Sequence, residues 1–149
     1  MRIVHANRVS TSLKVLVGVL MATVVFTVAA NAQPIFVGNF TLAHEVHWGQ
    51  AVLPAGEYSI RMESVAGPAK IMPASGNWAV YTQAPITADS EKGGAYLTLT
   101  VVGNERRVHS MNLPALRKSV IFAPLTKSER EELAKGGQID KVPVVTAEK

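Results

Sequence analysis

The string His44-Glu45-Val46-His47 contains the residue types of a zinc protease site. In the zincin motif, two histidines four residues apart share one helix face, and a glutamate beside them acts as a general base. In this chain the second histidine follows the first by only three residues. Apolar and polar residues also alternate over 40–48, which predicts a strand with the two histidines on opposite faces. Both observations argue against a zincin site.

A second arrangement of the same residues could bind a metal ion. Glu45 and His47 share the polar face of the predicted strand, and His109 lies on another predicted strand. If the two strands are neighbours, the three side chains supply nitrogen and oxygen ligands for a divalent ion. We favour the plainer interpretation, an exposed Glu–His pair and an unrelated surface histidine, and predict no cofactor. His44 is expected to be a buried neutral imidazole bonded to the backbone, or else to be turned outward by a bulge.

The sequence carries no signature of nucleophilic catalysis or nucleotide binding. It has no cysteine and no Gly-x-Ser-x-Gly motif, and its two aspartates, Asp89 and Asp140, fall in a predicted loop and in the C-terminal tail. The glycine pairs 93–94 and 136–137 lack the spacing of a phosphate-binding loop. We therefore predict that the protein is not an enzyme.

Aromatic residues leave carbohydrate binding open as an alternative. Trp48 and Tyr58 fall on the apolar side of their predicted strands and are expected in the core. Tyr81 and Tyr96 fall on the other side, so they are the candidate ligand-binding residues. The plainer interpretation is that these two tyrosines are ordinary cross-strand partners.

The first 32 residues predict export. Three basic residues precede an apolar run over 15–29, and Ala30-Asn31-Ala32 supplies a small-x-small cleavage site. We expect cleavage between Ala32 and Gln33; the alternative is a retained anchor, although the run is shorter than the roughly 20 residues of a spanning helix. The mature protein is then periplasmic or extracellular, with no membrane span.

Charge argues against nucleic acid as a partner. Without residues 1–32 the chain keeps 12 basic and 11 acidic residues, which reduces the net charge from +4 to +1. The remaining basic residues form no run longer than two, whereas a nucleic-acid binder concentrates them on one face. The 117 residues that remain are enough for one domain with one hydrophobic core.

Short alternating segments predict an all-β domain. Leu53-Pro54-Ala55-Gly56 is typical of a tight turn between antiparallel strands, here 40–48 and 57–63. Further strands are expected at 77–83, 95–102, 106–113 and 119–123. This pattern favours an antiparallel β-sandwich or a partly open barrel over residues 33–137.

One short C-terminal helix is also predicted. Thr126 or Ser128 can cap it with a glutamate three residues later, Gly136-Gly137 ends it, and Leu133 is expected to dock it. Residues 138–149 form a tail, either a loose end or one more edge strand, since Pro143 is tolerated at an edge.

Two passages resemble a group of small exported bacterial β-domain proteins with no established activity. The first is the strand from Phe40 followed by Leu-Pro-Ala-Gly-x-Tyr, and the second is the Leu-x-Lys-Ser-x-x-Glu-x-x-Leu helix that starts at Leu125. This sequence has Ala43 where the group usually has proline. The resemblance implies a fold and export, and it implies no chemistry.

These observations predict an exported, non-enzymatic β-module that binds an unknown protein or glycan partner or supports an envelope assembly. The first alternative is a carbohydrate-binding module. The second is a divalent-metal-binding protein or metal-dependent enzyme that uses Glu45, His47 and His109.

Overall fold

The computed structural model describes residues 33–147, so the predicted signal sequence, with Ala32 at its end, lies outside the described residues. Within this range, no helix is both long enough and apolar enough to cross a membrane. The elements are β1 (Phe36–Leu42), β2 (Val46–Trp48), β3 (Ala51–Leu53), β4 (Gly56–Met62), β5 (Ala69–Pro73), β6 (Val80–Tyr81), β7 (Ile86–Asp89), β8 (Tyr96–Val102), β9 (Glu105–Leu113), η1 (Pro114–Leu116), β10 (Lys118–Ile121), α2 (Lys127–Ala134), β11 (Gln138–Pro143) and β12 (Val145–Thr146).

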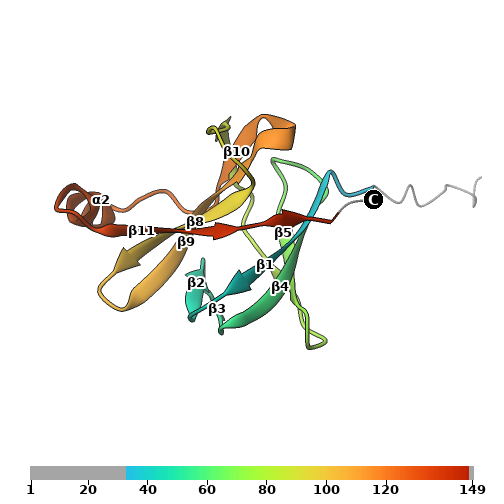
Figure 1. Cartoon of the computed structure of the whole chain (residues 1–149), viewed down its shortest axis with the longest axis horizontal. Helices are drawn as coiled ribbons and strands as arrows, with labels where there is room; N and C mark the ends of the chain where they lie inside the picture. Colours follow the sequence, from blue (N-terminus) through green and yellow to red (C-terminus); the bar gives the residue numbers. More distant parts are fainter. Residues whose placement is uncertain (1–32, 148–149) are drawn as a thin grey trace, which may run out of the picture. The chain divides into compact units, whose positions relative to one another are not determined.

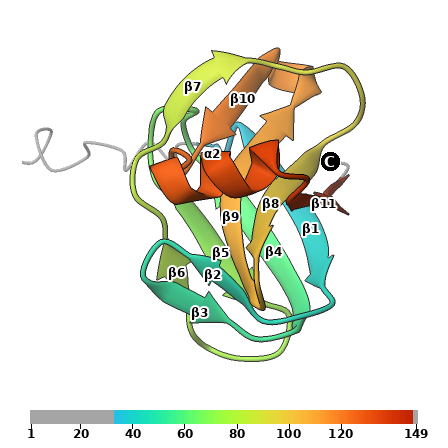
Figure 2. The ribbon, with the colours of Figure 1, turned by 90° about the vertical axis from the view of Figure 1, so that its left-hand side faces the viewer.

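Two sheets, named here sheet A and sheet B, make up the fold. Sheet A has five strands in the order β12-β1-β4-β5-β6. Sheet B has seven: β11-β8-β9-β10-β7 in order, with the β2–β3 hairpin attached to β9. Figure 2 shows β8 and β9 of sheet B in front of β4 and β5 of sheet A. Neither sheet closes on itself, so the predicted all-β class is confirmed, with a sandwich-like arrangement and not a barrel.

Alternate side chains of the long strands enter one core between the sheets. Tyr58, Ile60 and Met62 of β4 are at most 3% exposed, and so are Leu97 and Leu99 of β8. Burying a large apolar side chain contributes about 1.5–3 kcal/mol, which lets a chain without disulfides stay folded.

The predicted single strand over 40–48 is wrong, because the chain bends at residues 43–45. β1 ends at Leu42 in sheet A, and β2 begins at Val46 in sheet B. Both residues are buried, so the period of two continues across the break between sheets. His44 lies in the bend and is exposed, and the prediction of a buried imidazole is therefore also wrong.

The Leu53-Pro54-Ala55-Gly56 turn connects two sheets and does not close a hairpin. It joins β3 of sheet B to β4 of sheet A, where Gly56 pairs with Leu42 of β1. The Tyr58 hydroxyl donates a hydrogen bond to the carbonyl oxygen of Pro54 at 2.8 Å. This bond holds the turn against β4 where the chain passes from sheet B to sheet A.

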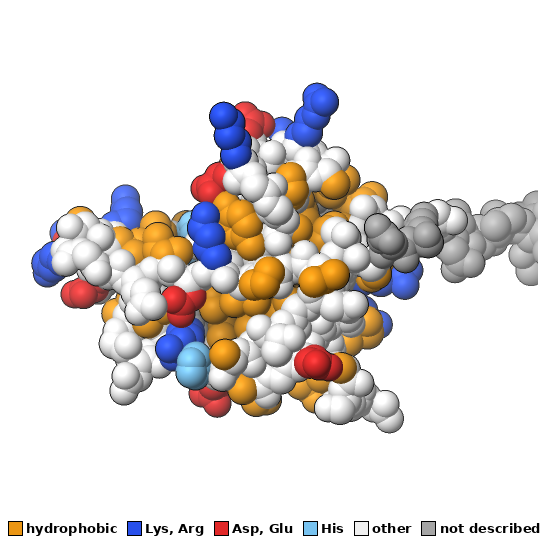
Figure 3. All heavy atoms as spheres, in the orientation of Figure 1, with side chains coloured by type: hydrophobic (Ala, Val, Ile, Leu, Met, Phe, Trp, Pro, Cys, Tyr) orange, Lys and Arg blue, Asp and Glu red, His pale blue; other side chains and the backbone are white. Residues whose placement is uncertain are grey.

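Sheet edges account for most other differences from the prediction. β5 and β7 were not predicted, and only Val80–Tyr81 of the expected strand 77–83 is extended, which leaves Trp78 43% exposed. Residues 138–146, expected as a tail, form β11 against β8 and β12 against β1, as Figure 1 shows for β11. Of the two alternatives for this segment, the structure has edge strands. These edge strands leave Ile139 and Val145 exposed. Figure 3 shows hydrophobic side chains near the centre of one face of the molecule.

The C-terminal helix begins as predicted and docks differently. Thr126 is its cap, and the capping box with Glu129 is complete. Leu133 is only half-buried, and the residue that α2 buries is Glu129. The helix is therefore held by a polar anchor and not by an apolar one.

Candidate functional site

The structure does not gather Glu45, His47 and His109 into one group. β2 and β9 are neighbours, with His47 opposite Arg107, so the premise behind the metal hypothesis is met. However, Nδ1 of His47 lies 3.9 Å from a carboxylate oxygen of Glu105, and Nδ1 of His109 lies 2.6 Å from the carbonyl oxygen of Ala123. Glu45 is in the exposed bend before β2. Among residues 33–147, no three His, Asp or Glu side chains are placed to hold a metal ion.

Tyr96, one of the two tyrosine candidates, is already engaged by its neighbours. Its hydroxyl donates a hydrogen bond to Glu91 and accepts one from Nζ of Lys141 at 3.2 Å. That ammonium also lies 4.3 Å from the centroid of the Tyr96 ring. The hydrogen bond to Tyr96 raises the pKa of Lys141. A ring covered in this way offers little surface to a ligand.

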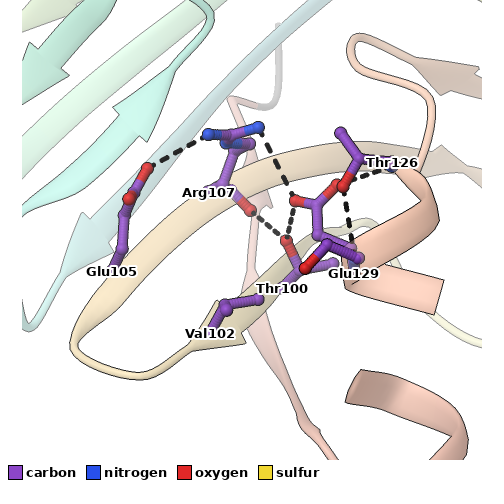
Figure 4. A pocket seen from close by; sticks show the side chains of 7 residues that line it. Thr100, Val102, Glu105, Arg107, Thr126 and Glu129 are labelled. Atoms are coloured by element: carbon purple, nitrogen blue, oxygen red, sulfur yellow. Dashed lines mark hydrogen bonds and ion pairs between the residues drawn. The ribbon is translucent and has the colours of Figure 1, made fainter. Parts of the chain in front are cut away.

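A pocket of about 270 Å³ lies beside α2, and Figure 4 shows the polar network inside it. Glu129 accepts hydrogen bonds from the backbone N–H of Thr126 at 2.7 Å and from the Thr100 hydroxyl at 3.2 Å. Arg107 approaches the same carboxylate at 3.8 Å. The bond from Thr126 closes the helix cap, and the contacts with Thr100 and Arg107 join α2 to the β8–β9 hairpin, so the network holds the helix on sheet B.

These contacts decide the charge state of Glu129. Burial alone acts to raise the pKa of this carboxyl. The hydrogen bonds from Thr126 and Thr100 and the charge of Arg107 outweigh burial and hold its pKa below the ordinary value. A carboxylate that stays ionised and fully hydrogen-bonded is a poor general base, and we interpret Glu129 as an anchor.

Tyr81, the other tyrosine candidate, belongs to an open surface. Arg61 of β4 is opposite Lys70 of β5, and Lys70 is opposite Tyr81 of β6, so the three form a row across the outer side of sheet A. We call this row the basic–aromatic face. Tyr81 is 65% exposed, and Nζ of Lys70 lies 5.9 Å from its ring centroid. A cavity of about 590 Å³ opens along the row, also lined by Glu63, Ser64, Gly67, Pro68 and Met72.

The two cations of the basic–aromatic face have no counter-ion in the part of the chain that the structure describes. Within residues 33–147, neither Arg61 nor Lys70 forms an ion pair. Like charges directly opposite each other on adjacent strands are destabilising. A bound anion would therefore reduce the repulsion between Arg61 and Lys70. Glu63 adds one acceptor to the same cavity. Sequence reasoning identified Tyr81 alone, because the cations become its neighbours only through β5, which was not predicted.

Comparison with known proteins gives no match to a family, to a curated protein or to a solved structure. The resemblance stated from the sequence therefore stays a prediction, and the function has to be argued from the residues of the site.

Proposed function

We propose that this chain is an exported, non-enzymatic binding module whose ligand is a carbohydrate held at the basic–aromatic face. The observation that carries the proposal is a row beside a cavity, made of an exposed tyrosine ring and two cations that form no ion pair within the described range. The cavity volume lies within the range of small-ligand sites, about 300–1,000 Å³. The metal-based alternative has no comparable support, because the described residues do not bring its three side chains together.

The residues of the face match what a sugar requires. A flat exposed ring such as Tyr81 can lie against the C–H side of a pyranose, while its hydroxyl groups need donors and acceptors around it. Arg61 and Lys70 supply donors, and Glu63 supplies an acceptor. None of the four side chains is tied up in an ion pair in the described part of the chain.

Substituting Tyr81→Ala is expected to weaken glycan binding about tenfold, which corresponds to about 1.4 kcal/mol. The ring contributes contact area, and the side chain is exposed, so the fold should be unaffected. Isothermal titration of a panel of neutral and acidic polysaccharides against the purified residues 33–149 gives the affinities. Thermal melts of wild type and variant check that both are folded.

Tyr96→Ala is the matched control, because this tyrosine lies in sheet B with its hydroxyl already bonded. It should bind the same glycans as the wild type. The proposal is wrong if no glycan in the panel binds, or if Tyr81→Ala and Tyr96→Ala lower the affinity equally.

A further inference from the structure

Tyr81 stands between two cavities. The first is the cavity of the basic–aromatic face. The second, which we call the edge hollow, has a volume of about 420 Å³ and lies past the edge of sheet A. It is lined by Trp48, Gly49, Gln50, Ala51, Val80, Tyr81, Thr82, Gln83 and Phe122.

The edge hollow exists because two short strands end the sheets there. β6 pairs only with β5 in sheet A, and β3 pairs only with β2 in sheet B. The strands have two and three residues, and beside them Phe122 is only half-buried, while Trp48 is 3% exposed. Figure 2 shows β6 near the β2–β3 hairpin.

The lining of the edge hollow combines aromatic rings with amides. Trp48 and Phe122 meet edge to face with ring centroids 5.0 Å apart. The indole N–H of Trp48 is buried and has no hydrogen-bond acceptor among residues 33–147. The side-chain amides of Gln50 and Gln83 lie exposed at the hollow, and neither makes a hydrogen bond within the same range. A hydroxyl-bearing ring could use the donors and acceptors of the two exposed amides.

We infer that the ligand is an acidic oligosaccharide that extends from the basic–aromatic face, over Tyr81, into the edge hollow. This inference rests on the proposed function and names the substrate class of that site. The Arg61–Lys70 pair favours a carboxylate or sulfate on the sugar at that end, because neither cation has a counter-ion among residues 33–147. The edge hollow presents no charged side chain, so the sugars there are recognised through rings and hydroxyl groups.

An anionic membrane surface shares the negative charge but fits the site less well. Glu63 lines the cavity beside the two cations, so the cavity suits one carboxylate or sulfate and not a dense array of anionic head groups. Residues 33–149 also carry a net charge of only +1, which gives weak attraction to a charged surface. Vesicle binding is therefore an alternative outcome of the test.

The test uses Trp48 as a reporter of the edge hollow. The chain has two tryptophans, so Trp78→Phe leaves Trp48 as the single one. Galacturonate oligomers from the disaccharide to the hexasaccharide are titrated into this variant. We expect the affinity to rise about tenfold or more with length, and only the longer oligomers to shift Trp48 emission. Maltooligosaccharides of equal length, which lack the carboxylate, should bind more weakly.

A second variant fills the edge hollow. Ala51→Leu should reduce the affinity for the hexasaccharide to that for the disaccharide, while disaccharide binding stays unchanged. Ala88→Leu, on the exposed strand β7, is the matched control and should leave both affinities unchanged. Two outcomes separate the two proposals. Length-independent binding with constant Trp48 emission overturns this inference and leaves the proposed function intact. Binding to anionic phospholipid vesicles without binding to any glycan overturns both.

Discussion

Asn112→Asp should destabilise the domain by about 3 kcal/mol at neutral pH, although the two side chains have nearly the same shape. Asn112 is 1% exposed on β9. Its amide N–H₂ donates to the carbonyl oxygens of Glu91 and Gly94, both at 3.1 Å, while its oxygen accepts from the backbone N–H of Glu91 at 2.9 Å. The new carboxylate keeps the last bond and turns the first two into contacts between oxygens. A buried charge with two lost donors explains the size of the effect.

Urea denaturation of both proteins measures this difference. The loss in the free energy of unfolding should become smaller as the pH falls, because the new carboxyl group becomes protonated and can then donate a hydrogen bond to one carbonyl oxygen. Asn104→Asp, in the exposed turn between β8 and β9, is the matched control and should change the free energy of unfolding by less than about 0.5 kcal/mol. Equal effects at the two positions would mean that the hydrogen bonds of Asn112 with Glu91 and Gly94 do not set the size of the effect.

The strands that could be predicted are those with alternating buried apolar residues within one sheet. Tyr58, Ile60 and Met62 point to the core at every second position, and so do Leu97 and Leu99. The helix cap was predictable for a similar reason, since Thr126 and Glu129 interact across three residues. In these cases the physical cause is local in sequence.

Sheet membership could not be predicted, because alternation identifies the buried side of a strand and not its partner. Leu42 and Val46 keep the period of two while the chain passes from sheet A to sheet B. The β7 strand could not be predicted for a different reason. All four of its residues are exposed, so it has no alternation, and only its pairing with β10 defines it.

The candidate site depends on register between strands far apart in sequence. Arg61, Lys70 and Tyr81 become one row because β4 pairs with β5 and β5 with β6, and each residue alone is an ordinary surface side chain. Glu129 was missed in a related way. The sequence predicts its role in the cap, but its contacts with Thr100 and Arg107 require the β8–β9 hairpin to lie under α2.

Glu129→Gln should lower the free energy of unfolding by about 2 kcal/mol at neutral pH, because hydrogen bonds to a charged carboxylate are replaced by weaker ones. The pKa of Glu129 is lowered in the folded state from its ordinary value of 4.5. A carboxyl group of this kind stabilises the fold fully above its ordinary pKa and loses that contribution as the pH falls through the lowered value. The difference in the free energy of unfolding between wild type and variant should therefore be constant near neutral pH and should decrease in acid.

Urea denaturation at a series of pH values measures this gap. Glu132→Gln is the matched control, since it makes the same change at an exposed position of α2 and should give a small difference at every pH. A gap for Glu129→Gln that stays the same from neutral to strongly acid pH would mean that the charge of this carboxylate contributes nothing. The helix would then be held on sheet B by the half-buried Leu133, as the sequence alone predicts.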